Sequence, residues 1–173
     1  FDYNPEVIPE ALSDRIKFAN ALESFPLTKG EEKPKKALFW KQPYGTAMFC
    51  GKRYESRTWR TNFRGLILVC TSLKPYEFKR VLEVSGYEQY RRINCAIEGD
   101  KTRNLHGFAI GVVNMVDCFP MKAEHENEAF VKYDPDLFIW KMENPRPIKP
   151  FVLKGQMGFM NLTPEIIAMI EYI

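Results

Sequence analysis

The sequence predicts an α+β fold with a small barrel or a strongly curved sheet, because short apolar strands alternate with helical segments along the chain. Of the 173 residues, 45% are hydrophobic, which is enough for one globular core. No run of about 18 uncharged apolar residues occurs, so we expect no membrane-spanning helix. These observations indicate a single main domain and exclude a largely disordered chain.

The N-terminal part of the chain is predicted to form a helix followed by a linker. Apolar side chains recur at steps of three and four residues over 6–25, as they do on one face of a helix, and Phe25-Pro26 ends this pattern. Residues 28–36 carry no apolar side chain, which indicates an exposed linker. We therefore assign residues 1–36 to an extension and residues 37–173 to the main domain.

The main domain opens with short elements. Pro43 and Gly51 fit the first position of a helix and the position after its end, which predicts a helix over 43–50. Residues 53–59 alternate as a strand does, with Glu55, Arg57 and Trp59 on one side. Residues 65–70 are apolar and rich in β-branched side chains, and they predict a buried strand.

The second half of the domain continues the alternation of helices and strands. Pro75 opens a helix that Gly86 interrupts, and a second helical piece is expected over 87–96. Strands are expected over 107–118, 136–142 and 155–162. Thr163-Pro164 predicts the start of a C-terminal helix.

Cysteine and histidine spacing gives no support for a metal centre. The four cysteines, at positions 50, 70, 95 and 118, contain no Cys-x-x-Cys pair, and the two histidines lie 19 residues apart. Four cysteines are also too few for a secreted disulfide framework in a chain of this length, and residues 1–5 lack the features of a signal peptide. We expect reduced cysteines, no metal, no cofactor and a cytoplasmic location.

Positive charge is concentrated in one segment. The net charge is +3, but residues 50–65 hold five Lys and Arg side chains against one Glu, so this segment carries +4 and the rest of the chain −1. Tyr54, Trp59 and Phe63 are interleaved with these cations. Cations attract phosphate and aromatic rings stack on bases, so the pattern favours nucleic-acid binding. A solvated charged face is the alternative.

Four short motifs follow one another in the same region: Gln42-Pro43-Tyr44, Gly51-Lys52, Glu55-Ser56-Arg57-Thr58-Trp59 and Phe63-Arg64-Gly65. This order resembles the signature of the ASCH (activating-signal-cointegrator homology) domain family within the PUA-like superfamily, Gly-x-Lys-x-x-Glu-x-Arg followed by Trp and by Tyr/Phe-Arg-Gly. The signature glycine is displaced, because Cys50 stands in its place and Gly51 follows. The resemblance extends over residues 37–162 and is most specific over 42–65.

The resemblance implies a small PUA-like β-barrel whose cleft binds RNA or a modified nucleoside. Its ligand-binding residues here are Tyr44, Lys52, Glu55, Arg57, Trp59 and Arg64. We expect Lys52 to meet a phosphate or a carbonyl, Glu55 to read a polar edge, and Trp59 or Tyr44 to stack on a base. The structural alternatives are a Glu55–Arg57 ion pair that holds the barrel together and a Trp59 ring within the core.

Two other functions stay open, an enzyme and a protein-interaction adaptor. One branch of the superfamily hydrolyses N4-acylated cytidine with a lysine, a threonine three residues later and a distal glutamate. Lys52 matches that lysine, Glu55 stands at the threonine position, and Asp117 is the candidate distal acid. Another branch is associated with ribonuclease activity, which a Lys/Tyr/Arg cleft would support by stabilising phosphorane charge. In an adaptor, the basic segment would dock an acidic partner.

Overall fold

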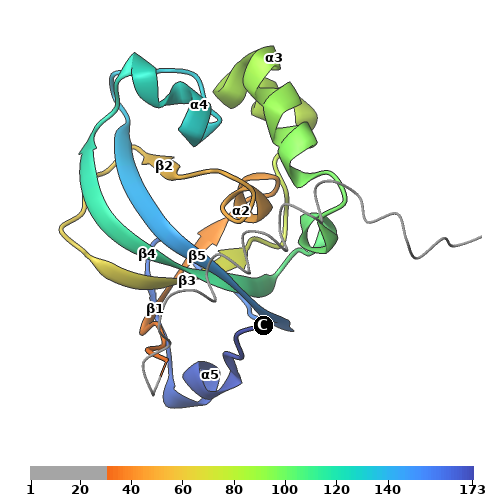
Figure 1. Cartoon of the computed structure of the whole chain (residues 1–173), viewed down its shortest axis with the longest axis vertical. Coiled ribbons are helices and arrows are strands. Elements are labelled where there is room, and N and C mark those ends of the chain that lie inside the picture. The colour runs from red at the N-terminus through yellow and green to blue at the C-terminus, as the bar shows by residue number, and fades with distance from the viewer. Residues whose placement is uncertain (1–30) are drawn as a thin grey trace, which may run out of the picture. The chain divides into compact units, whose positions relative to one another are not determined.

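A six-stranded mixed sheet forms the centre of the computed structural model, which describes residues 31–173 (Figure 1). The predicted helix over 6–25 and most of the predicted linker lie outside these residues. The strands are β1 (Lys36–Trp40), β2 (Tyr54–Arg57), β3 (Gly65–Thr71), β4 (Phe108–Pro120), β5 (Phe138–Val152) and β6 (Met160–Asn161). Their order in the sheet is β2-β5-β4-β3-β1-β6. The β1–β3 pair is parallel and the other neighbouring pairs are antiparallel.

Four α-helices complete the described part and confirm the α+β class: α2 (Tyr44–Ala47), α3 (Phe78–Ile97), α4 (Glu126–Ala129) and α5 (Pro164–Met169). Gly86 has a φ of 74°, so α3 consists of two helical pieces that meet at this residue, as predicted. The rings of Phe78 and Tyr90 lie 5.1 Å apart between centroids, whereas a straight helix would separate these residues by about 18 Å. The two pieces therefore fold back on each other.

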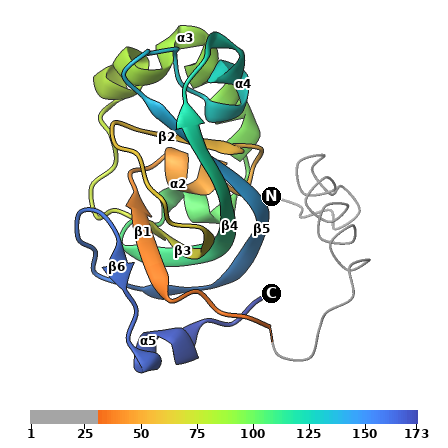
Figure 2. The same cartoon turned by 90° about the vertical axis from the view of Figure 1, so that its left-hand side faces the viewer.

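The sheet is strongly curved but it is not a closed barrel, which corrects the expectation of a small β-barrel. The long strands β4 and β5 bend across the molecule (Figure 2), and their register shifts at three places, where the local twist increases. Within residues 31–173, no backbone ladder joins the end strands β2 and β6. The reason is that β6 has only two residues and pairs with β1, while the chain leaves β2 after Arg57 as an irregular loop.

Side chains close the opening that the backbone leaves. The Arg57 Nη2 donates to the carbonyl of Phe39 on β1, at 3.2 Å. Trp59 follows β2 and Phe159 precedes β6, and the centroids of their rings lie 5.9 Å apart. The ring of Trp140 on β5 stacks on Phe159, with 5.6 Å between centroids. We call these five residues the seam.

The core lies on both faces of the sheet. On the face covered by α2, α3 and α4, the buried side chains include Leu38, Trp40 and Ile67. On the opposite face, Leu68 and the other buried side chains form a cluster against which Ile166 of α5 packs. Strands β1 and β3 are thus buried on both sides. In the part of the chain described, no helix is long and apolar enough to cross a membrane.

Candidate functional site

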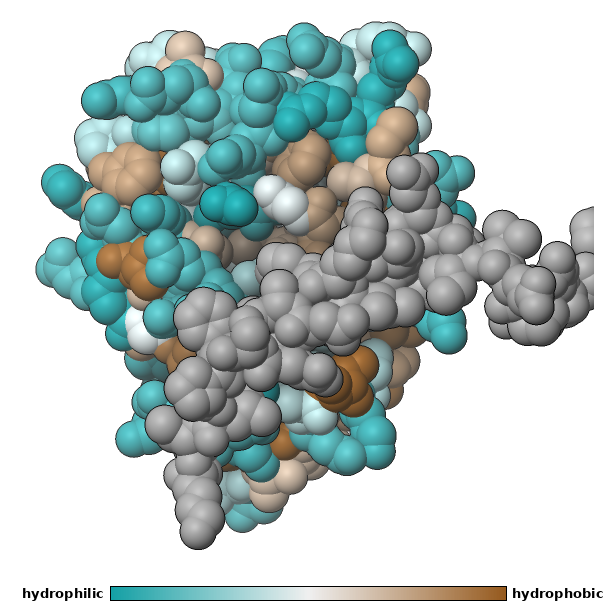
Figure 3. Space-filling view, viewed as in Figure 1, coloured by the Kyte–Doolittle hydropathy of each residue, from teal (hydrophilic) through white to brown (hydrophobic). Residues whose placement is uncertain are grey.

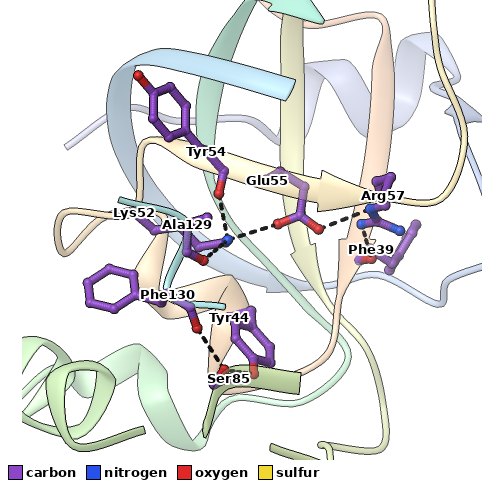
Figure 4. A network of polar contacts seen from close by, with 9 residues as sticks. All are labelled: Phe39, Tyr44, Lys52, Tyr54, Glu55, Arg57, Ser85, Ala129 and Phe130. Atoms are coloured by element: carbon purple, nitrogen blue, oxygen red, sulfur yellow. Dashed lines mark hydrogen bonds and ion pairs between the residues drawn. The ribbon is translucent and has the colours of Figure 1, made fainter. Parts of the chain in front are cut away.

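Three charged side chains, Lys52, Glu55 and the seam residue Arg57, form an ionic network (Figure 4). Lys52 follows α2 and is 3% exposed, and Glu55 on β2 is 7% exposed. The Lys52 Nζ lies 3.4 Å from Glu55 Oε2, and Glu55 Oε1 lies 3.0 Å from Arg57 Nε. The alternation of β2 places Glu55 and Arg57 on one side, as predicted, and the i, i+3 spacing brings Lys52 to the same carboxylate. The structure therefore brings three of the six predicted ligand-binding residues into one ionic network.

The Lys52 ammonium uses its hydrogen-bonding capacity inside the protein. Its Nζ donates to the carbonyl of Tyr54 at 2.6 Å and to the carbonyl of Ala129, at the end of α4, at 2.5 Å. With Glu55 these acceptors account for its three N–H groups. Burial lowers the pKa of Lys52 below its ordinary value, and the Glu55 carboxylate opposes part of that shift. Lys52 thus connects β2 to α4, and its predicted contact with a ligand stays a prediction.

Tyr44 lies at the bottom of the same region and points away from solvent. Its hydroxyl hydrogen-bonds to Ser85 Oγ, and Ser85 Oγ donates to the carbonyl of Phe130 at 2.6 Å. The Lys52 Nζ is 5.7 Å from the centre of the Tyr44 ring, a cation–π contact. Burial raises the pKa of Tyr44 to about 12. Tyr44 therefore joins α2 to the first piece of α3, and stacking of this ring on a base stays a prediction.

The raised pKa of Tyr44 predicts a loss of stability at high pH. Because the folded pKa is about 12 and the unfolded value is 10.0, the folded state keeps a proton that the unfolded state releases above pH 10. The contribution is complete below pH 10 and falls as pH rises, by about 1.4 kcal/mol at about pH 11. Urea unfolding of the wild type and of Tyr44→Phe at pH 9 and 11 measures it. The stability difference between them should shrink by that amount, and an unchanged difference would contradict the assignment.

The other predicted residues lie at the surface. Trp59 is 37% exposed, and it packs edge to face on the buried Trp140, with 4.5 Å between centroids. The Trp140 Nε1 donates to the backbone carbonyl of Trp59 at 3.2 Å. Arg64 pairs with Asp117 at 3.4 Å, with both side chains exposed. Asp117, the candidate distal acid, thus contacts Arg64, whereas Lys52 contacts Tyr54, Ala129 and Glu55; a catalytic role for Lys52 with Asp117 stays a prediction.

Sequence reasoning missed the main-chain partners of the network. The carbonyls of Phe39, Ala129 and Phe130 accept hydrogen bonds from Arg57, Lys52 and Ser85. A carbonyl acceptor leaves no signature in residue type, and these contacts span up to 77 positions. The one sequence feature that singles out Ser85 is its position directly before Gly86, the residue that interrupts α3.

An open depression elsewhere contains none of the predicted residues. It lies between the end of α3 and the 3-10 turn Lys101–Asn104, and it is lined by Asn94, Ile97, Glu98, Arg103 and Asn104. Most of these side chains are exposed, so the depression is shallow surface rather than a built site. Within residues 31–173, no group of three His, Cys, Asp or Glu side chains is arranged to hold a metal ion. The seam and the buried network beside it are therefore the candidate site.

Comparison with known proteins gives no family for this chain: a scan against protein-family models found no match, and a search of curated proteins found no relative. The functional argument consequently depends on the geometry of the site.

Proposed function

We propose that this protein is an ASCH-type, PUA-like module that binds single-stranded RNA or a modified nucleoside at the seam. In this proposal, Trp59 stacks on a base, and Arg57, Arg60 and Arg64 attract the phosphates. Lys52 and Glu55, which are buried beneath these side chains, hold β2 in place. The observation that carries the proposal is an exposed tryptophan that the buried core holds in a fixed position among arginines.

The fixed position of Trp59 supports a stacking role. Its ring is in edge-to-face contact with Trp140 and Phe159, and its carbonyl is held by the Trp140 indole. A ring that is already ordered loses little conformational entropy when a ligand stacks on it. Exposed aromatic side chains within a basic segment are typical of single-strand binding surfaces.

The charges around Trp59 support attraction of phosphates. Arg60 is exposed and lies over the ring of Phe138, 5.9 Å from its centre. The Arg64 side chain is 40% exposed and the Arg57 side chain 23%. Among residues 31–173, Arg64 is the one of these three with an exposed acidic partner, Asp117, and exposed pairs of this kind are weak. Arg60 is therefore the guanidinium best placed to meet a phosphate, while Arg57 and Arg64 add positive charge beside it and already bond to main-chain carbonyls.

Hydrolysis of a nucleoside or of RNA is the second candidate function, and the lowered pKa of Lys52 favours it. A buried amine with a lowered pKa is a common general base or nucleophile. The Lys52 side chain is only 1% exposed, and its N–H groups already have acceptors. An enzyme would thus require the network to rearrange before Lys52 met a substrate, which makes binding the better supported function.

The test is a titration of a labelled single-stranded RNA with the wild type and with Trp59→Ala. Loss of one stacked base should weaken binding about tenfold or more. Tyr87→Ala is the matched control, because Tyr87 is a 69% exposed aromatic residue on α3, and it should leave affinity unchanged. Arg60→Ala should weaken binding and reduce the salt dependence by about one counterion.

The same samples separate the alternatives. Product formed from RNA or from N4-acetylcytidine by the wild type, but not by Lys52→Ala, would make the protein an enzyme. The absence of binding at physiological salt would contradict the proposal and favour an adaptor. Equal affinity of the wild type and Trp59→Ala would remove the observation on which the proposal depends.

A further inference from the structure

A buried N–H group beside the seam stands without a hydrogen-bond acceptor. Trp40, at the end of β1, is 2% exposed, and its Nε1 has no partner among residues 31–173. The neighbouring Arg57 Nε differs from it, because it is ion-paired with Glu55 Oε1 at 3.0 Å, although outside hydrogen-bond geometry. Buried donors without acceptors are rare, because each costs free energy. The unsatisfied Trp40 donor therefore requires an explanation.

The two donors belong to residues in direct contact. The Arg57 guanidinium carbon lies 5.6 Å from the centre of the Trp40 ring, and the Arg57 Nη2 bonds to Phe39, the neighbour of Trp40. In the described part of the chain, three buried side-chain nitrogen or oxygen atoms lack a hydrogen-bond partner, and two of them are this pair. The unsatisfied Trp40 N–H on β1 and the partly exposed Arg57 guanidinium on β2, which contacts the Trp40 ring, indicate a position for an acceptor beside Trp40.

We infer that Trp40 Nε1 and Arg57 form a subsite for a hydrogen-bond-accepting oxygen of the ligand, and specifically for a carbonyl of the base. This inference rests on the proposed function, and it extends the site from the exposed Trp59 to the buried end of β1. Arg57 belongs to both parts, because its side chain is 23% exposed while its Nε is buried.

The chemistry of the two donors decides which oxygen fits. An indole N–H is neutral, and burying a phosphate against it would cost far more than burying a carbonyl. Exposed arginines such as Arg60 and Arg64 are the better partners for phosphate. The subsite thus suits a base whose edge offers a carbonyl, such as the O2 of a pyrimidine, and the surface around it suits the sugar-phosphate backbone.

The closing experiment follows the indole N–H groups of the full chain by NMR. The protein has three tryptophans, so a nitrogen-15 spectrum contains three indole signals. Titration with cytidine should move the Trp40 indole proton downfield, as expected for a new hydrogen bond, by more than that of Trp140, which already has an acceptor. Ribose 5-phosphate offers phosphate without a base and should leave Trp40 unmoved.

A variant gives an independent readout. Trp40→Phe keeps an aromatic ring and removes the donor, so affinity for cytidine should fall about fivefold, the contribution of one ordinary hydrogen bond. Leu38→Val is the matched control, because Leu38 lies on the same strand and the same buried face but offers no donor. If Trp40→Phe fails to fold, the titration of the wild type still decides.

The outcomes separate this inference from the proposed function. Binding of RNA and cytidine with an unmoved Trp40 signal overturns the subsite and leaves the Trp59 surface standing. A Trp40 signal that responds equally to ribose 5-phosphate overturns the assignment to a base carbonyl. Absence of binding by RNA and by cytidine overturns both proposals together.

Discussion

Replacing Glu55 by alanine should lower the free energy of unfolding by about 3–5 kcal/mol, the usual cost of removing one partner from a buried ion pair. Glu55 is the carboxylate between two cations, Lys52 and Arg57, and Lys52 is almost entirely buried. Without Glu55, the ammonium keeps its two carbonyl acceptors but loses the opposing charge. Urea unfolding at neutral pH measures the effect.

The matched control for Glu55→Ala is Glu143→Ala. Glu143 also pairs with a lysine, Lys141, at 3.5 Å, but both side chains are about half exposed. Exposed pairs contribute about 0–1 kcal/mol, so this variant should be nearly as stable as the wild type. Similar losses in the two variants would show that burial of the network has no energetic importance.

Gly111→Ala should destabilise the protein by about 3 kcal/mol, at the upper end of the usual range for overpacking. A β-carbon at Gly111 would overlap the ring of Phe49 and lie 2.8 Å from the backbone carbonyl oxygen of Arg146. The Phe49 ring can rotate only as far as its neighbours allow. The Arg146 carbonyl lies on β5, which is hydrogen-bonded to β4, the strand that contains Gly111. The change therefore forces the two longest strands apart.

Gly45→Ala provides the comparison for Gly111→Ala. Its β-carbon would lie 3.1 Å from a methyl group of Thr71 and meets no backbone atom closer than 3.4 Å, so a small shift of that side chain relieves the contact. Thermal or urea unfolding of both variants should show a clearly smaller loss for Gly45→Ala. Equal losses would contradict the assignment of the Gly111 effect to the backbone contact.

Elements with a strong local pattern could be predicted from the sequence. The apolar run of β3 and the interruption of α3 at Gly86 appear where they were expected. At the position of β5, the sequence predicts a strand over 136–142 only. The structure extends this strand, β5, to Val152. Its ladder with β2 ends at Lys141, and beyond that point β5 pairs with β4 and forms one isolated bridge, from Ile148 to Tyr172. Proline is tolerated along such a partly unpaired edge.

Elements and contacts that depend on distant partners could not be predicted. The strand expected over 155–162 shortens to Met160–Asn161, because β1 offers only Lys36 and Ala37 for pairing. The alternation over residues 53–59 predicts that Glu55 and Arg57 share a surface, but the sequence does not reveal that Lys52 is buried against the same carboxylate and the end of α4. Burial of Tyr44 likewise depends on Ser85, 41 positions away.

The seam changes which contacts set the diameter of this domain. In a closed barrel, the number of strands and their stagger fix the diameter, and widening it requires breaking a backbone ladder. Here β1 and β2 are connected across the opening by the Arg57 guanidinium and by packed rings. The separation of β1 and β2 is therefore set by side-chain packing, and widening the opening would break the Arg57–Phe39 hydrogen bond and the ring contacts while every strand keeps its ladder hydrogen bonds.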